Sequence, residues 1–285
     1  MEFYKYHGLG NDYIVIDPEA FTGELTPALI RTLCHRNFGV GSDGILLGPI
    51  RTKETPFFLR IFNPDGSEAE KSGNGLRIFS RYLWDKKRID HRPVSILTKG
   101  GMVQATVLDG GRAVTVEMGR VSFNSVDIPV TGPPRETLNE PLEIGGERFS
   151  FHAATIGNPH CVILRDQISA QEAKRLGPFI ESHPFFPNKI NVQFMRIIDR
   201  KTIAIEIWER GAGYTLASGS SSCASAAVAH KLGLCDSDIV VNMPGGAMEI
   251  HLAKDYSIRM TGAVVKIAEG FVSPEIFDTP PPLSS

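Results

Sequence analysis

Hydrophobic residues along the chain fall mostly into short runs that end at Gly, Pro, Asn or Asp, which is the pattern of β-strands joined by tight turns. Two runs rich in β-branched and aromatic residues, 57–62 and 202–208, predict strands. Residues 103–108 and 114–116 flank the Asp109-Gly110-Gly111 turn and predict a hairpin. The chain is therefore expected to be rich in strands.

Four segments follow a helical pattern instead. Residues 27–36 and 170–181 each predict one helix. A third helix is expected from Ser72 to near Lys86, where apolar residues recur at roughly 3.6-residue spacing. A fourth, from Ser218 to near Leu232, is small and apolar almost all round, which is typical of a buried helix. These elements predict an α+β fold in which a curved, mostly antiparallel sheet surrounds a central helix.

The chain contains an internal duplication. The Gly10-Asn11 pair recurs as Gly157-Asn158, 147 residues further on. The Ser72-Gly73 turn recurs as Ser218-Gly219 after 146 residues, and a pair of glycines repeats at almost the same offset. Because three separated matches share one offset, we expect two pseudo-symmetric lobes of similar fold.

The duplication predicts the domain boundaries. Residues 1–120 form the expected N-terminal lobe and residues 121–272 the C-terminal lobe. The Pro/Gly-dense stretch 131–135 is expected to mark the junction. Residues 273–285 are expected to pack on the N-terminal lobe or to be disordered, with disorder favoured in the Pro-rich tail 279–285.

Composition narrows the class of protein. The 30 Lys and Arg residues balance 32 Asp and Glu residues, so no excess charge favours nucleic acid or a membrane surface. No apolar run approaches the roughly 18 residues of a membrane span, and the first residues lack the pattern of a signal peptide. The four cysteines form no CxxC pair, which argues against a zinc site or a disulfide framework. A cytoplasmic protein is expected.

Both Ser-Gly turns are candidate anion-binding sites. The N–H groups at a helix start, helped by the helix dipole, can bind a carboxylate or phosphate. Gly73 and Asn74 would supply them in the first half, and Gly219 and Ser220 in the second. The alternative is an ordinary N-cap, for which Ser is a preferred residue. Anion binding is favoured because both halves keep the same turn.

Polar residues near these turns add further candidates. The Glu209-Arg210 pair lies between a Trp and a Gly-Ala-Gly loop, where its guanidinium could meet a substrate carboxylate. The Asn63-Pro64-Asp65-Gly66 segment is either a simple β-turn or part of the same site. His160, beside the duplicated Gly-Asn, is either a structural histidine or a functional one.

Six motifs, in order over nearly the whole chain, resemble those of the diaminopimelate epimerases. They are His7-Gly8-Leu9-Gly10-Asn11-Asp12-Tyr13, Phe38-Gly39-Val40-Gly41-Ser42-Asp43-Gly44, Asn63-Pro64-Asp65-Gly66-Ser67-Glu68-Ala69-Glu70, Gly73-Asn74-Gly75-Leu76-Arg77, Gly157-Asn158-Pro159-His160 and Glu209-Arg210-Gly211-Ala212-Gly213. The resemblance implies two lobes of helix-centred β-barrels with the active site between them, and a possible homodimer.

The resemblance also implies an activity: interconversion of the LL and meso forms of diaminopimelate for lysine and peptidoglycan synthesis, without pyridoxal phosphate, metal or other cofactor. By motif position, the substrate-holding residues would be Asn11, Asn63, Asn158, Asn191, Glu209 and Arg210, with Gly73, Asn74, Gly219 and Ser220 as the anion-binding turns. The partner would be a small amino acid or carboxylate.

The chain departs from the family at the proton carriers. The family has a cysteine at each turn, one acting as base and one as acid, and this chain has Ser72 and Ser218. A thiol has a pKa near 8.5, whereas an unassisted serine hydroxyl is several units weaker as an acid. Ser72 and Ser218, with His160 and Glu209, are the catalytic candidates, and either Lys71 or His160 could serve as the base.

Two further substitutions lie near the second turn: Tyr214 stands where the family has glutamate, and Ser221 where it has glycine. They favour a naturally divergent member over an engineered serine pair. Three functions remain open: a diaminopimelate epimerase with slow or altered chemistry, an isomerase or dehydratase of the same fold acting on another small carboxylate, and a ligand-binding paralogue without turnover.

Overall fold

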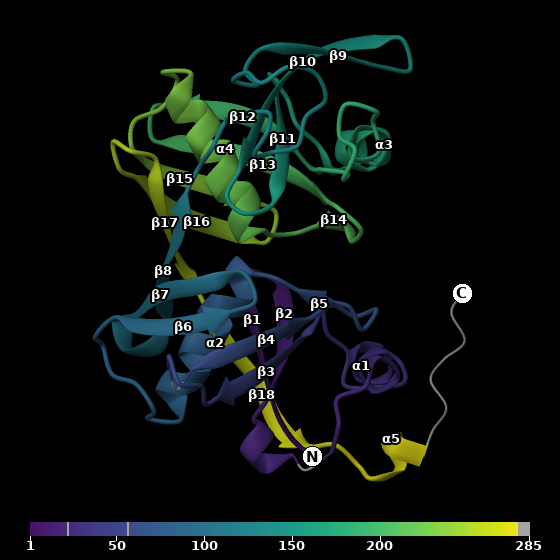
Figure 1. The fold of residues 1–285 in the computed structure, drawn as a ribbon, viewed down its shortest axis with the longest axis vertical. Coiled ribbons are helices and arrows are strands. Elements are labelled where there is room, and N and C mark those ends of the chain that lie inside the picture. The colour runs from purple at the N-terminus through teal and green to yellow at the C-terminus, as the bar shows by residue number, and fades with distance from the viewer. Residues whose placement is uncertain (22, 56, 279–285) are drawn as a thin grey trace. The chain divides into compact units, whose positions relative to one another are not determined.

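The structure is a computed structural model that describes residues 1–21, 23–55 and 57–278. Its chain divides into two compact units. Unit 1 combines Met1–Val116 with the chain from Gly262 onward, and unit 2 is Glu117–Thr261. Each unit is a mixed α+β structure with a curved sheet and few helices, as the sequence predicts (Figure 1).

Unit 1 begins with two strands and carries one long buried helix. Its main elements are β1 (Glu2–Gly8), β2 (Asn11–Ile16), α1 (Pro27–Cys34), β3 (Ile45–Ile50), β4 (Phe58–Phe62), β5 (Glu68–Ala69), α2 (Gly73–Asp85), β6 (Val94–Thr98), β7 (Gly101–Leu108), β8 (Ala113–Arg120) and β18 (Val265–Phe271). The last residues of β8 belong to unit 2. Short helices η1 (Pro18–Ala20), η2 (Asp109–Gly111) and α5 (Glu275–Asp278) complete it.

The sheet of unit 1 is mostly antiparallel, with two parallel pairs. Strand β18 pairs antiparallel with β1, β1 with β2, β3 with β4, β6 with β7 and β7 with β8, whereas β2–β3 and β4–β6 are parallel. Helix α2 contacts β1, β2, β3 and β7. Its apolar side chains Leu76, Phe79, Tyr82 and Leu83 are fully buried. The sheet therefore curves around α2 and buries its apolar face.

Unit 2 repeats the order of elements of unit 1 and has one further strand at its start. Its elements are β9 (Glu140–Ile144), β10 (Glu147–Thr155), β11 (Pro159–Leu164), α3 (Ala170–Glu181), β12 (Asn191–Asp199), β13 (Thr202–Glu209), β14 (Gly213–Thr215), α4 (Gly219–Lys231), β15 (Asp238–Met243), β16 (Gly246–Leu252) and β17 (Ser257–Ala263). The repeated order runs from β10 to β17, and the further strand is β9. The buried helix is α4, whose interior is almost entirely Ala, Ser, Cys and Val. The four long helices thus lie where the sequence places them, to within two residues at either end.

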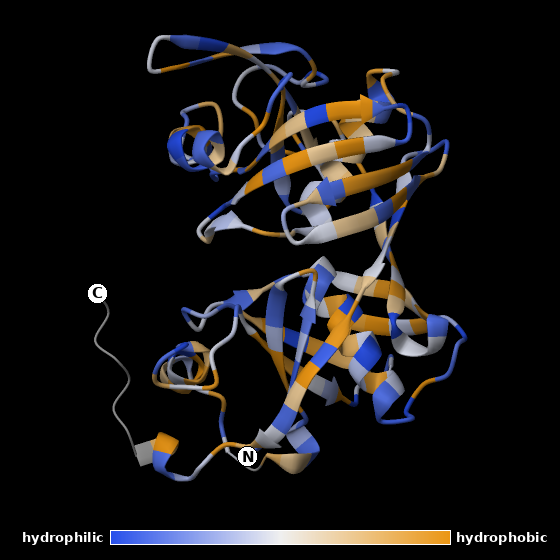
Figure 2. Cartoon of the chain, turned by 180° about the vertical axis from the view of Figure 1, so that it is seen from behind, coloured by the Kyte–Doolittle hydropathy of each residue, from blue (hydrophilic) through white to orange (hydrophobic). Residues whose placement is uncertain are grey.

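Strand pairing in unit 2 repeats that of unit 1. Pairs β10–β11, β12–β13, β15–β16 and β16–β17 are antiparallel, and β11–β12 and β13–β15 are parallel. Strand β9 pairs with β10 in the way that β18 pairs with β1. Hydrophobic and polar residues alternate along many strands of both units (Figure 2). The predicted duplication is therefore visible in the topology.

The unit boundaries differ from those expected. The boundary expected at 272 lies between Thr261 and Gly262, because β18 hydrogen-bonds to β1 and so belongs to unit 1. The stretch 131–135 is not a junction but lies inside unit 2, where Ser125 N–H donates to Arg135 O at 2.8 Å. In the C-terminal segment, Ile276 packs against the apolar core of unit 1. The tail 279–285 lies outside the described residues.

Candidate functional site

The N-terminus of α2 is built around Ser72. This residue is extended (φ −138°, ψ 120°) and caps the helix, with its Oγ accepting the Gly75 N–H at 3.0 Å. The helical ladder begins with Leu76 N–H bonded to Ser72 O at 2.9 Å. The N–H of Gly73 therefore lies ahead of the ladder, at the positive end of the helix dipole. Ser72 is the predicted N-cap, and the same geometry suits an anion.

Asn11 lies beside this helix start. The turn before it uses left-handed backbone at Leu9 (φ 57°) and Gly10 (φ 88°), which places Asn11 at the first position of β2. Asn74 Nδ2 donates to Asn11 Oδ1 at 2.9 Å, and Asn11 Nδ2 donates to Asp43 Oδ2 at 2.9 Å. With one partner on each side, the orientation of the Asn11 amide is fixed.

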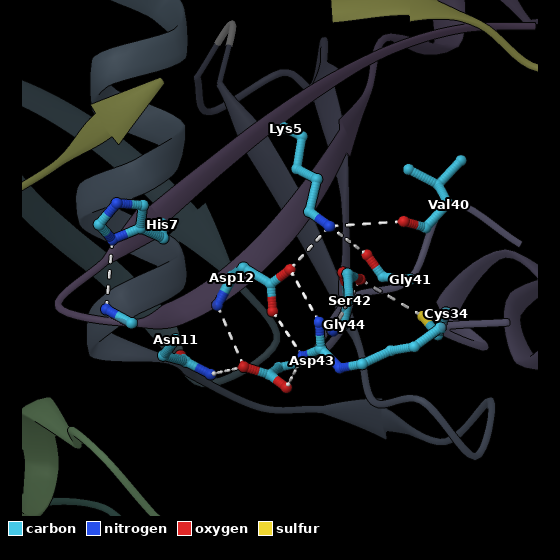
Figure 3. A network of polar contacts seen from close by, with 12 residues as sticks. Lys5, His7, Asn11, Asp12, Cys34, Val40, Gly41, Ser42, Asp43 and Gly44 are labelled. Carbon is cyan, nitrogen blue, oxygen red and sulfur yellow. Dashed lines mark hydrogen bonds and ion pairs between the residues drawn. The ribbon is translucent and has the colours of Figure 1, made fainter. Parts of the chain in front are cut away.

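Asp43 belongs to a charged cluster that supports Asn11 (Figure 3). Its Oδ2 also accepts the Asp12 N–H at 3.1 Å, and its Oδ1 lies 2.7 Å from Arg36. Asp12, which is nearly buried, pairs with Arg36 at 2.8 Å and with Lys5 at 2.9 Å. Sequence reasoning missed this cluster, although Asp43 lies in a quoted motif, because its partners are far apart in the chain.

The two carboxyls of the cluster shift in opposite directions. Burial acts to raise the pKa of Asp12, but its bonds to Arg36 and Lys5 outweigh burial and the pKa is lowered. Burial raises the pKa of Asp43, and the neighbouring Asp12 charge adds to that, against the bonds from the Asp12 N–H and Asn11. The cluster therefore keeps its negative charge most firmly on Asp12.

Replacing Asp43 with alanine should weaken substrate binding. The variant leaves Asn11 Nδ2 and the Asp12 N–H without their acceptor, which costs about 1–3 kcal/mol for such groups, or roughly 5- to 150-fold in affinity. Calorimetric titration with LL-diaminopimelate, the substrate that the resemblance implies, measures the effect. Asp90→Ala, which removes only an exposed pair with Arg92, is the control. Unchanged affinity in a folded Asp43→Ala protein would contradict the supporting role.

Asn63 forms the turn that the sequence allowed as an alternative. Its N–H donates to Ser67 O at 2.9 Å, its carbonyl accepts the Gly66 N–H at 3.0 Å, and its Nδ2 donates to Ser67 Oγ at 3.0 Å. The residue is exposed. The β-turn is therefore present, and a contribution of Asn63 to substrate binding stays a prediction.

The N-terminus of α4 repeats the arrangement of α2. Ser218, almost fully buried, caps the helix and accepts the Ser221 N–H at 3.4 Å. Asn158 Nδ2 donates to Ser220 Oγ at 3.2 Å. Asn158 and Ser220 correspond to Asn11 and Asn74 in the duplication, so both units link the asparagine of the Gly-Asn turn to the second residue of the helix.

His160 is fully buried behind Asn158. Its Nε2 lies 3.0 Å from Asn158 Oδ1. Burial lowers the pKa of His160 to about 3, the Arg210 charge acts in the same direction, and a hydrogen bond with Gln193 opposes both. At neutral pH the imidazole is therefore uncharged and a weaker base than imidazole in water. This favours a positioning role over the predicted role as base.

The Glu209-Arg210 loop is held from two sides. Asn191 Oδ1 accepts the Arg210 N–H at 3.0 Å, and Asn191 Nδ2 donates to Pro159 O at 2.8 Å, which ties the loop to the segment that carries Asn158. The Arg210 guanidinium donates to Asn188 O at 3.1 Å and is exposed. The buried Asn191 side chain thus holds the backbone of this loop, and its contact with a substrate stays a prediction.

Glu181 is a supporting residue that sequence reasoning missed. It is the last residue of α3, and its carboxylate accepts Trp208 Nε1–H at 2.8 Å and Gly211 N–H at 3.1 Å. Lys189 Nζ lies 3.4 Å away. A carboxylate at a helix C-terminus is unfavourable next to the helix dipole, so its position was a signal that it has another partner.

The two substitutions near the second turn have different surroundings. Tyr214 Oη donates to Glu206 Oε2 at 2.7 Å, and Lys174 Nζ lies 4.7 Å from the ring centroid. Ser221 is fully buried, and its Oγ accepts Gln193 Nε2 at 3.0 Å. Ser221 therefore joins the polar interior behind the α4 N-terminus.

The predicted residues form one group in each unit. Unit 1 brings together Asn11, Ser72, Gly73 and Asn74. Unit 2 brings together Asn158, His160, Asn191, Arg210, Ser218, Gly219 and Ser220. Glu209 lies at the end of β13, and Lys71 directly precedes the Ser72 cap.

Comparison with known proteins shows the family of the chain. The family model for diaminopimelate epimerase matches residues 3–124 and 152–267. The chain belongs to the diaminopimelate epimerase family. It is 61% identical over 277 residues to diaminopimelate epimerase 2 of Nostoc sp. (strain PCC 7120), covering 97% of each chain. It is 36% identical to the diaminopimelate epimerase of Moorella thermoacetica, covering 95% of this chain and 98% of that one.

Solved structures of low identity share the fold. A probable proline racemase from Agrobacterium radiobacter K84 superposes with a TM-score of 0.70 at 16% identity, over 97% of this chain and 94% of that one. A hydroxyproline epimerase from Agrobacterium vitis gives 0.69, also at 16% identity, over 95% and 91%. At this identity the likeness shows the fold alone. Within the described residues, no helix is long and apolar enough to span a membrane.

Proposed function

We propose that the chain is a cofactor-independent epimerase that inverts the α-carbon of diaminopimelate by removing and returning its proton. The observation that carries this proposal is the duplicated pair of capped helix starts, each linked to an asparagine of the Gly-Asn turn. The high identity to proteins named diaminopimelate epimerase supports the substrate. The retained Glu209-Arg210 loop, held by Asn191, supports binding of an amino acid through its charged groups.

Ser72 and Ser218 determine the rate of α-carbon inversion that we expect. Each serine Oγ accepts an N–H of its own helix, at 3.0 Å for Ser72 and 3.4 Å for Ser218, and this stabilises negative charge on the oxygen. A serine hydroxyl nevertheless remains a weaker acid than the thiol that the family has at these positions. We therefore expect inversion to be slower than in family members with two cysteines.

Deuterium exchange tests the proposal. Incubation of the protein with LL-diaminopimelate in D2O should place deuterium at the α-carbon and form the meso isomer, both measured by NMR. A clean absence of exchange over days at high protein concentration would refute the proposed reaction. Size-exclusion chromatography of the same sample tests the expected homodimer, and fractionation of cells tests the expected cytoplasmic location.

A second candidate is a ligand-binding member of the family without turnover. It is favoured by one observation: both serine hydroxyls are engaged as N-caps, a structural role that needs no catalysis. This candidate predicts tight binding of diaminopimelate by calorimetry with no exchange. An isomerase or dehydratase acting on another small carboxylate would instead show exchange or water loss in a substrate screen.

A further inference from the structure

Ser72 has a phenol beside it. Tyr13 Oη lies 3.2 Å from Ser72 Oγ, and either oxygen can donate the hydrogen bond. The two residues come from different elements, β2 and the cap of α2, so the contact depends on the folding of unit 1. Tyr13 is the second residue after Asn11, and it corresponds by the duplication to His160, the second after Asn158.

The ring of Tyr13 packs against Gly44, which fixes its position. Tyr13 is 8% exposed, and its ring lies against Gly44, where a Cβ would come within 2.7 Å of the ring and 2.5 Å of Phe62 O. The ring therefore packs where Gly44 has no side chain. Ser72 Oγ is meanwhile held by the Gly75 N–H at 3.0 Å. Both oxygens are positioned by their own elements.

From this contact we infer that Tyr13 and Ser72 act as one proton-carrying pair in the proposed epimerase, with Ser72 as the relay and Tyr13 as the group that holds the proton. The inference rests on the proposed function. A phenol in water has a pKa near 10, within about two units of a thiol, whereas a lone serine hydroxyl is far weaker as an acid. The pair thus gives this position a stronger acid than serine alone, though a weaker one than the missing thiol.

The proton transfer balances within the pair. When the pair acts as acid, the Ser72 O–H bond breaks as a C–H bond forms at the substrate α-carbon, and the Tyr13 proton passes to Ser72 Oγ. The products are an intact serine and a phenolate at Tyr13. When the pair acts as base, the same steps run in reverse: the phenolate takes the proton from Ser72 as Ser72 takes the α-proton. No oxidant, reductant or further reactant is needed.

Tyr13→Phe removes the phenol oxygen and keeps the ring. We expect α-deuterium exchange to fall at least about 50-fold in kcat, with KM for diaminopimelate within about threefold of wild type, because the change lies in proton transfer and not in binding. The matched control is Tyr6→Phe, a fully buried tyrosine of β1 whose Oη donates to Asp85 at 2.9 Å. It should exchange within twofold of wild type.

Ser72→Cys separates a proton relay from a structural role. A thiol carries the proton by itself. Tyr13→Phe should therefore lower kcat for α-deuterium exchange at least about 50-fold in the protein with Ser72, and less than about threefold in the Ser72→Cys background. A loss of the same size in both backgrounds would overturn the inference, because it would mean that Tyr13 only supports the fold. Wild-type exchange in Tyr13→Phe would overturn it as well.

A second measurement needs no turnover. In Ser72→Cys, a phenol O–H that donates to the thiolate lowers the pKa of the introduced thiol, so adding Tyr13→Phe should raise that pKa by about one unit. The pH dependence of iodoacetamide alkylation measures it. The four native cysteines are buried, and the protein without the introduced thiol corrects for them. Equal thiol pKa values in the two backgrounds would show that the oxygens are not paired.

The two measurements keep the proposals distinguishable. If wild-type protein does not exchange but the thiol pKa still shifts, the proposed epimerase function fails. The hydrogen bond between Tyr13 and Ser72 is then real, but the pair does not carry a proton to the substrate, and the inference fails too. If wild-type protein exchanges and neither Tyr13→Phe effect appears, the epimerase function stands and the inference fails.

Discussion

Replacing Ser72 and Ser218 together by cysteine is expected to raise the rate of α-proton exchange on diaminopimelate by about two to three orders of magnitude. Each pKa unit between proton carriers corresponds to about 1.4 kcal/mol, and a thiol is several units more acidic than an unassisted hydroxyl. Both positions already cap their helices, so a thiolate there would face the positive ends of α2 and α4. The exchange assay in D2O measures the gain.

The double replacement has a cost and a control. Cysteine is a poorer N-cap than serine, so each substitution should lower the free energy of unfolding by about 1 kcal/mol. Ser80→Cys, a buried serine of α2 whose Oγ donates to Leu76 O at 2.8 Å, introduces a thiol away from the helix start and should not raise exchange. A folded double variant with no gain would count against both the epimerase and the ligand-binding candidate.

The second large effect is expected at Glu181. Glu181→Gln replaces one of the two carboxylate oxygens by an NH2 group, so either Trp208 Nε1–H or Gly211 N–H loses its acceptor. Hydrogen bonds to charged groups contribute about 1.5–3 kcal/mol, which corresponds to a fall in Tm of roughly 4–10 °C for a domain of this size. Exchange should fall as well, because Gly211 directly follows Arg210.

The effect at Glu181 should depend on pH. Burial acts to raise the pKa of Glu181, but the bonds from Trp208, Gly211 and Lys189 outweigh burial and the pKa is lowered. A carboxyl with a lowered pKa in the folded state stabilises the protein above its unfolded pKa of about 4.3, and this stabilisation is lost as pH falls through the folded pKa.

Thermal unfolding of wild type and Glu181→Gln should therefore differ at pH 7. The difference should begin to shrink near pH 4.3 and vanish only below the lowered folded pKa of Glu181. Glu143→Gln, an exposed carboxyl, is the matched control and should change Tm by less than about 1 °C. A constant difference between wild type and Glu181→Gln across this range would mean that the ionised carboxylate is not the source of the stability.

Much of the fold could be predicted because the sequence contains an internal duplication. Two helices with the same Ser-Gly start and two Gly-Asn turns at one offset predicted two similar α+β units, and the strand pairing of β1–β2–β3–β4 and β10–β11–β12–β13 repeats accordingly. The residues of β18 alone could not show to which unit this strand belongs. Its run at 265–271 looks like any exposed strand, and only pairing with β1 assigns it to unit 1.

The turns of the candidate site could be predicted from the sequence, but the residues that hydrogen-bond to those turns could not. Ser72 and Ser218 mark helix starts by residue type, whereas Asp43 and Glu181 bind partners that lie 27 to 32 residues away in the chain. The ionisation of His160 was equally hidden, because its lowered pKa comes from complete burial, which a single histidine in a sequence does not reveal. Residue types alone can therefore predict a helix start, but they cannot predict which side chains are buried and how burial shifts their pKa.

The pairing of β18 with β1 also sets an order of assembly during synthesis. Strand β1 leaves the ribosome about 260 residues before its partner, which at about 5–20 residues per second is a delay on the order of 13–50 s. Unit 2 is one uninterrupted segment and emerges whole within that interval. The residues of β1 are thus made long before their pairing is complete. Until β18 arrives, β1 has one unpaired edge, and such an edge can pair with another strand.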